Sequence, residues 1–166
     1  ALLASSNVDG AEKQLNQLTS PASTGQDAKL RRAMIAFLER DLEKLKDLTP
    51  LLDLAKIKET EKDWALFLKS MATFPGEESN AQFEQAMKLA ATPGRSTEFK
   101  LLRVKEELLR TGGSEVLAAN LKRQMEEFRG TEAAKEFSIQ HVMVLHAIGK
   151  KKEALAELES QLKRNN

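Results

Sequence analysis

The chain has no cysteine, no tyrosine and only one tryptophan, and its 166 residues include four prolines and eight glycines. Without cysteine, disulfides, thiolate metal sites and cysteine nucleophiles are excluded. A lack of thiols suits a reducing cytosol and a bacterial periplasm equally, so the localisation stays unknown. β-Branched residues are sparse and no stretch alternates polar and apolar residues, so the sequence predicts no sheet.

Neither sign of charge dominates, and no apolar run is long enough to cross a membrane. Lys and Arg total 26, and Asp and Glu total 25. Proteins that hold nucleic acid or an anionic membrane surface need a basic excess. We therefore expect no nucleic-acid partner and no membrane span.

Between the prolines and glycines, apolar residues recur every three or four positions, which predicts an all-α chain. Residues 1–26 are predicted to be an N-terminal segment and linker, with a short helix over 8–18. Residues 27–58 are predicted to form N-terminal helices. The first of these runs over 27–48, and Thr49 caps the next one.

Three glycines stand at nearly equal intervals along the rest of the chain. Gly76, Gly113 and Gly149 are 37 and 36 residues apart, and each lies near the middle of an interval bounded by a further break. A fixed period of this size indicates stacked helical hairpins, because one hairpin cannot bury its whole apolar face alone. The predicted hairpin repeats are 59–94, 95–130 and 131–166.

The last of these repeats resembles a tetratricopeptide repeat. "HAIGKKKEALAELESQL" has that family's turn and second-helix pattern, with Gly149 at the turn and Ala154 where helices pack closely. Gly113 and Ala118 stand at the corresponding positions one repeat earlier. The period is longer than the family's 34 residues, its aromatic positions are mostly aliphatic here, and its terminal proline is missing. The resemblance covers about residues 59–166 and implies a short right-handed α-solenoid that binds a protein or peptide on its concave face.

The "GKKK" at 149–152 has two interpretations. A phosphate-binding loop needs an upstream glycine-rich stretch and a preceding strand, and neither is present. We favour Gly149 as the C-terminal cap of one helix, with the lysines in a solvated turn. By the same local logic, Ser96 and Ser114 are predicted to be N-caps.

No residue pattern nominates a catalytic group, a metal site or a cofactor. The two histidines, His141 and His146, are five residues apart and point about 140° apart on a helix, so they do not share a metal. We expect both to be partly exposed helix residues, although either could serve singly in a site. The chain is therefore predicted not to be an enzyme.

The surface predicted to bind a partner lies on the first helices of the repeats. Lys100, Arg103, Glu107 and Arg110 follow each other at helical spacing and make a mostly basic stripe. These cations could pair with peptide carboxylates, or they could form an ordinary solvated helix face. The predicted partner-binding residues are Lys100, Arg103, Arg110 and Met143.

An aromatic-rich stripe precedes this region. Trp64, Phe67, Met71 and Phe74 fall three or four residues apart. The stripe could form an apolar groove for a partner's side chains. We expect it to be core, because a chain with so few aromatic residues needs them inside.

These patterns favour a non-catalytic interaction or scaffold module that binds a protein or peptide partner. An alternative is an accessory or docking domain cut from a larger enzyme or secretion component, which suits a chain that begins at alanine. RNA binding by helical repeats is a third possibility, against which the balanced charge argues.

Overall fold

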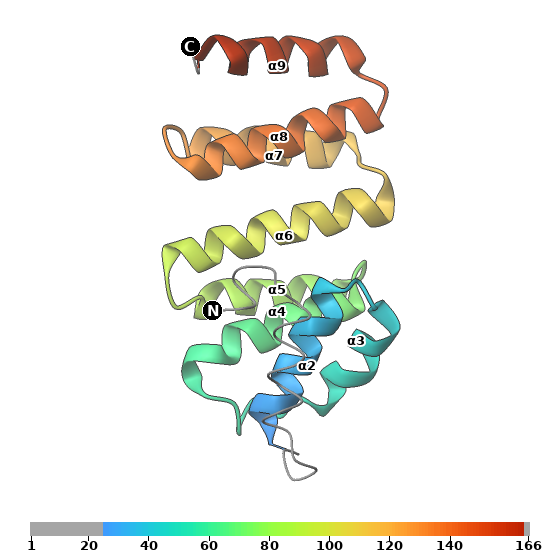
Figure 1. Ribbon diagram of the computed structural model, residues 1–166, viewed down its shortest axis with the longest axis vertical. Helices are drawn as coiled ribbons and strands as arrows, with labels where there is room; N and C mark the ends of the chain where they lie inside the picture. Colours follow the sequence, from blue (N-terminus) through green and yellow to red (C-terminus); the bar gives the residue numbers. More distant parts are fainter. Residues whose placement is uncertain (1–24, 165–166) are drawn as a thin grey trace. The chain divides into compact units, whose positions relative to one another are not determined.

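The computed structural model describes residues 25–164, and in this range the chain is all-α (Figure 1). The described helices are α2 (Gln26–Leu38), α3 (Leu42–Leu48), α4 (Lys62–Thr73), α5 (Glu77–Leu89), α6 (Pro93–Thr111), α7 (Glu115–Glu127), α8 (Glu132–Ala147) and α9 (Lys151–Arg164). The predicted fold class is thus confirmed as all-α, whereas the helix predicted over 8–18 lies outside the described residues. Within them, no helix is long and apolar enough to cross a membrane.

The chain divides into two compact units at Pro93. The first contains α2 to α5, and the second contains almost all of α6 together with α7, α8 and α9. The stacking of hairpins into a solenoid and the boundaries of the three repeats stay predictions.

Aromatic side chains form the centre of the first unit. Phe67 on α4 is fully buried and meets Phe37 on α2 edge to face, with ring centroids 5.5 Å apart. Trp64 packs on Phe67 in the same way at 5.7 Å, a geometry that the ring quadrupoles favour. Met71 is also fully buried. The core interpretation of the aromatic stripe is confirmed for Phe67 and Met71.

The single helix predicted over 27–48 is wrong, because the chain turns after α2. Arg40 takes the left-handed backbone conformation, with φ of 63°. Asp41 then caps α3, its carboxylate accepting a 3.0 Å hydrogen bond from the backbone N–H of Lys44. A carboxylate that satisfies a free N–H and favours the positive end of the helix dipole is enough to start a new helix here.

The prediction that Thr49 caps an α-helix is also wrong. Thr49 lies inside a short 3-10 helix, η1 (Thr49–Leu51). The chain then runs irregularly to a second one, η2 (Glu59–Glu61), which leads into α4. Proline at position 50 fits either kind of helix start, so it did not distinguish them.

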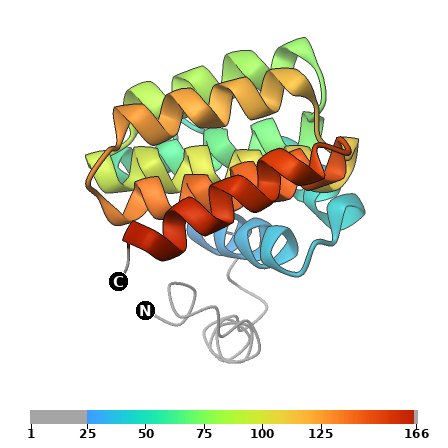
Figure 2. The same ribbon diagram turned by 90° about the horizontal axis from the view of Figure 1, so that it is seen from above.

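In the second unit, successive helices run antiparallel (Figure 2). Near the start of α6, Lys100 forms a 3.0 Å ion pair with Glu127 at the end of α7, and α8 packs against both α7 and α9. The apolar core of this unit consists of Leu108, Leu117, Ala118, Leu121, Phe137, Val144, Leu145 and Ala154.

The glycine bends differ in conformation. Gly113 and Gly149 have φ of 87° and 83°, in the left-handed region that suits glycine. Gly149 caps α8 as predicted: its N–H donates to the carbonyl of His146 at 3.1 Å, and the N–H of Lys150 donates to the carbonyl of Leu145 at 2.8 Å. Gly76 is extended instead, with φ of 178°.

Of the two predicted serine caps, one is confirmed. Ser114 caps α7, its hydroxyl accepting a 3.0 Å hydrogen bond from the N–H of Leu117. Ser96 is not a cap, because α6 begins at Pro93 and Ser96 lies inside its first turn. Proline has no N–H to satisfy and a φ that suits a first helical turn, so it starts the helix earlier.

Candidate binding groove on the C-terminal helices

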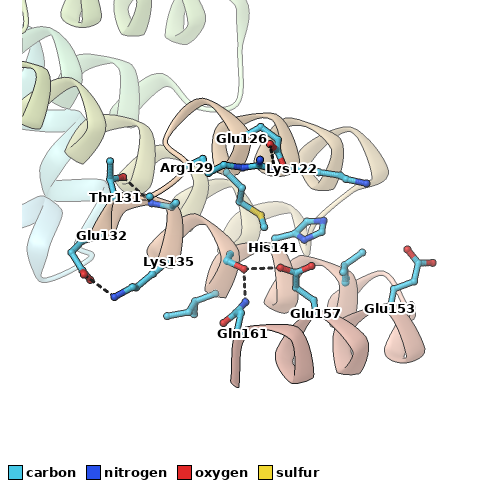
Figure 3. A pocket seen from close by; sticks show the side chains of 16 residues that line it. Lys122, Glu126, Arg129, Thr131, Glu132, Lys135, His141, Glu153, Glu157 and Gln161 are labelled. Carbon is cyan, nitrogen blue, oxygen red and sulfur yellow. Dashed lines mark hydrogen bonds and ion pairs between the residues drawn. The ribbon is translucent and has the colours of Figure 1, made fainter. Parts of the chain in front are cut away.

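The second unit has an open groove of about 710 Å³, with α8 as its floor and α7 and α9 as its walls (Figure 3). This volume is within the range of small-molecule and cofactor sites. Its lining includes Lys122, Met125, Glu126 and Arg129 on the α7 side, Glu132, Lys135, Ser138, Ile139, His141 and Leu145 on α8, and Glu153, Glu157 and Gln161 on α9.

A chain of hydrogen bonds joins the floor of the groove to its α9 wall. The amide of Gln161 donates to the hydroxyl of Ser138. That hydroxyl in turn donates to the carboxylate Oε1 of Glu157 at 2.9 Å. Ser138 is 5% exposed, so its hydroxyl is satisfied in both roles, and it holds Glu157 against α8 (Figure 3).

His141 lies one turn further along the floor. It is 8% exposed, and its Nδ1 is buried without a hydrogen-bond partner. Burial lowers the pKa of His141, and the charge of Lys122 on α7 lowers it further, while Glu157 and Glu153 on α9 act in the opposite direction. The imidazole is therefore neutral at pH 7, because burial disfavours the charged form.

Charges on the α7 side and the near end of α8 are largely paired within their own segments. Arg129 pairs with Glu126 at 2.7 Å, and Lys135 pairs with Glu132 at 2.7 Å. On the α9 wall, Glu153 lies 4.0 Å from the ammonium of Lys150, at the limit of an ion pair. The less compensated charges of the groove are thus Lys122 on the α7 wall, for which no ion pair is found within the described residues, and the carboxylates of Glu153 and Glu157 on the α9 wall.

The groove does not have the arrangement of a nucleophilic catalyst. Activation of a serine needs a base that takes its proton, with a third group orienting that base. Here Ser138 donates directly to Glu157, and no hydrogen bond joins Ser138 to His141 in the part of the chain that the structure describes. That part also contains no cluster of three or more metal-ligating side chains.

None of the four predicted partner-binding residues lines this groove. Lys100 pairs with Glu127 and lies over the ring of Phe128, 5.0 Å from its centroid. Met143 is 47% exposed on α8. The structure therefore gives Lys100 a local role, and leaves Met143 open to solvent.

The two arginines of the predicted surface are mostly covered. Arg103 is 8% exposed, and its pKa is lowered by burial and by the nearby charge of Arg110. The side chain of Arg110 is 14% exposed and pairs with Glu106 at 3.1 Å, the local pairing that their spacing of four residues permits. The structure brings the charges of these two arginines near each other and covers most of both side chains. Their role in partner binding stays a prediction.

The groove residues were missed because they belong to different helices. His141 was expected to be partly exposed, which is wrong, whereas His146 is exposed. A signal was available: Phe137, His141 and Leu145 are four residues apart and share one helix face. No sequence pattern pairs that face with Glu157.

A second feature is an apolar stripe on α9. Leu155, Leu158 and Leu162 are 59%, 41% and 66% exposed, while Ala154 on the same helix is buried. Ala154 packs into the core of the unit, so the stripe lies beside the contact of α9 with α8. Three large apolar side chains on one side of one helix form an exposed apolar patch, and such patches often mark a contact with another protein or structural element.

Comparisons with models of protein families, with curated proteins and with solved structures found no match for this chain.

Proposed function

We propose that this chain is a non-catalytic interaction module that binds a segment of a protein partner in the groove between α7 and α9. The observation that carries the proposal is an open groove whose floor contains buried polar side chains among apolar ones. Such a floor is typical of sites that orient a ligand by a few polar contacts and hold it by apolar burial.

The composition of the groove suits a peptide. Met125 is half-buried and Leu145 is buried, and both present apolar surface. Ile139 is 45% exposed and offers surface that a partner could cover. Methionine adapts its shape to different partners. Ser138 and His141 supply polar positions between these apolar surfaces.

The resemblance to tetratricopeptide repeats belongs to this proposal. The antiparallel order of α6 to α9 and the glycine cap at Gly149 support it. The resemblance implies binding on the face of the first helices. The walls of the groove are α7 and α9, the second helices of the predicted repeats, while its floor is α8, the first helix of the last one. The groove is the better supported surface, because its side chains are both accessible and varied in chemistry.

The test is a selection of phage-displayed random peptides on the immobilised chain, followed by NMR mapping of a selected peptide. We expect shifts at α7, α8 and α9 residues that line the groove, and loss of binding in Ile139→Arg. Val116→Arg is the matched control, because Val116 is 70% exposed on α7 and does not line the groove. Selected peptides that map elsewhere, or that bind Ile139→Arg unchanged, would contradict the proposal.

A second candidate is the accessory or docking domain, which the apolar stripe of α9 favours. Leu155, Leu158 and Leu162 are arranged to pack against a further structural element. Hydrogen exchange of α9 tests this by comparing the isolated chain with the protein as purified from its native source. Slower exchange at these leucines in the native protein would support docking, and equal exchange would count against it.

A further inference from the structure

We propose that the part of the groove beside His141 holds an arginine side chain of the bound partner. This inference rests on the proposed function and deepens it, by assigning the chemical class of the group that the groove recognises. It is carried by two independent features: the carboxylates of the α9 wall, and an unpartnered buried nitrogen on the floor.

The first feature is the charge of the α9 wall. Glu153 and Glu157 are four residues apart on α9, so their carboxylates lie one above the other on the same side of the helix. Ser138 donates to Oε1 of Glu157 and thereby orients the carboxylate along the floor. Within the described residues, no other hydrogen bond or ion pair is found for the carboxylate of Glu157, so acceptor capacity remains for a ligand.

The second feature is His141. It is more than nine-tenths buried, at 8% exposure, and its Nδ1 has no partner. A buried polar atom left unsatisfied is costly, so a ligand group that satisfies it gains affinity. Nδ1 itself lies below the surface of the groove, so contact with a ligand requires rotation about the Cβ–Cγ bond, which is a soft torsion in histidine. In the tautomer protonated at Nε2, Nδ1 accepts a hydrogen bond.

Because these groups all accept hydrogen bonds, the ligand group that suits them is a cationic donor. Guanidinium carries five N–H donors in one plane and can bridge a carboxylate and a neighbouring acceptor at once, whereas an ammonium is a compact point charge. Met125 and Leu145 offer apolar surface for the aliphatic part of the side chain. Lys122 stands on the opposite wall, α7, and its repulsion directs the ligand's cation toward α9.

The neutral state of His141 is consistent with this occupant. Burial, the dominant effect on its pKa, keeps the imidazole uncharged, so the floor does not repel a guanidinium. The groove is larger than one arginine side chain, and the remainder would hold neighbouring residues of the segment. The complementarity therefore concerns one position in a longer peptide.

The test uses N-acetyl-L-argininamide as the probe and N-acetyl-L-norleucinamide as its uncharged counterpart. Shifts of the His141 ring protons and the Met125 methyl are followed by NMR during titration of the intact chain. We expect saturable shifts in the millimolar range with the arginine probe, and no saturable shift with the norleucine probe.

Substitutions then assign the contact. Glu157→Gln keeps an oxygen that can accept from Ser138 but removes the charge, and should weaken the arginine probe about tenfold, as the loss of a charged hydrogen bond implies. Glu159→Gln is the matched control, because Glu159 is exposed on the same helix and lies outside the groove. Glu153→Gln is the second variant if circular dichroism shows that Glu157→Gln does not fold.

Equal weakening by Glu159→Gln would overturn the inference, since it would show a general charge effect. Equal shifts with both probes would overturn it as well. The two proposals fail separately. If selected peptides occupy the groove but lack arginine and the arginine probe leaves His141 unmoved, only the arginine assignment is lost. If no peptide maps to the groove, the proposed function itself is lost.

Discussion

Gly113, in the bend between α6 and α7, leaves less than ordinary room for a side chain beside Leu108 of α6. A Cβ built on Gly113 would stand 3.5 Å from Cγ1 of Val144 and 3.3 Å from Cδ1 of Leu108. The bend is therefore both a turn and a packing surface: a Cβ would meet Val144 at an ordinary contact distance, whereas the Leu108 side chain would have to shift by a few tenths of an ångström.

We expect Gly113→Ala to destabilise the chain more than Gly149→Ala. Both positions have a positive φ, 87° and 83°, so both substitutions carry the same backbone strain of about 1–2 kcal/mol. Only Gly113 has close neighbours, whereas a Cβ on Gly149 would meet nothing within 4 Å. The crowding should cost about 1 kcal/mol more, measured by urea unfolding. Equal losses would show that the Leu108 side chain shifts freely to make room for the added Cβ.

The cap at Asp41 should carry measurable stability. Asp41→Ala removes the acceptor of the Lys44 N–H and should lower the free energy of unfolding by about 1 kcal/mol. Asp41→Asn keeps an acceptor and should lower the free energy of unfolding by only about a few tenths of a kcal/mol. Urea unfolding of both variants gives the comparison. An equal loss in the asparagine variant would show that the charge, and not the hydrogen bond, starts α3.

His141 should make the second unit less stable in mild acid. Its folded pKa lies below the ordinary value of 6.5, through burial first and Lys122 second, opposed by Glu157 and Glu153. Below pH 6.5 His141 is protonated in the unfolded chain but stays neutral in the folded chain. The free energy of unfolding therefore falls as the pH falls toward the folded pKa. Above pH 6.5 His141 is neutral in both states, so it no longer makes the free energy of unfolding depend on pH.

Thermal unfolding at pH 7.5 and pH 5.5 checks this expectation. His141→Gln should lose less of its melting temperature on acidification than the original chain does. His146→Gln is the matched control, because His146 is exposed on the same helix. If the melting temperature falls more between pH 7.5 and pH 5.5 in His141→Gln than in His146→Gln, the account is contradicted.

Two leucines test the difference between core and open surface with the same chemical change. Leu121 is fully buried on α7, whereas Leu162 is 66% exposed on α9. Leu121→Ala should cost about 2–5 kcal/mol, the usual range for a core leucine. Leu162→Ala should stay within about 0.5 kcal/mol. A large loss at Leu162 in the isolated chain would show that the α9 stripe is already covered.

The sequence by itself determined the helical class and most helix ends of the second unit. The cap at Gly149, the cap at Ser114 and the left-handed bend at Gly113 depend on groups within a few residues of each other. Such local hydrogen bonds and backbone preferences can be read from spacing and residue type. The break at Arg40 was missed because the apolar stripe continues through it, and only Asp41 marks the new start.

Only the tertiary structure decided the groove. The burial of His141 depends on how α7 and α9 flank α8, and the bond from Ser138 to Glu157 joins residues 19 positions apart. The same holds for the covered arginines, because Arg103 belongs to a stripe that spacing alone would allow to face solvent. Helical periodicity says which residues share a face, while burial depends on which neighbours cover that face, and that is settled by long-range packing.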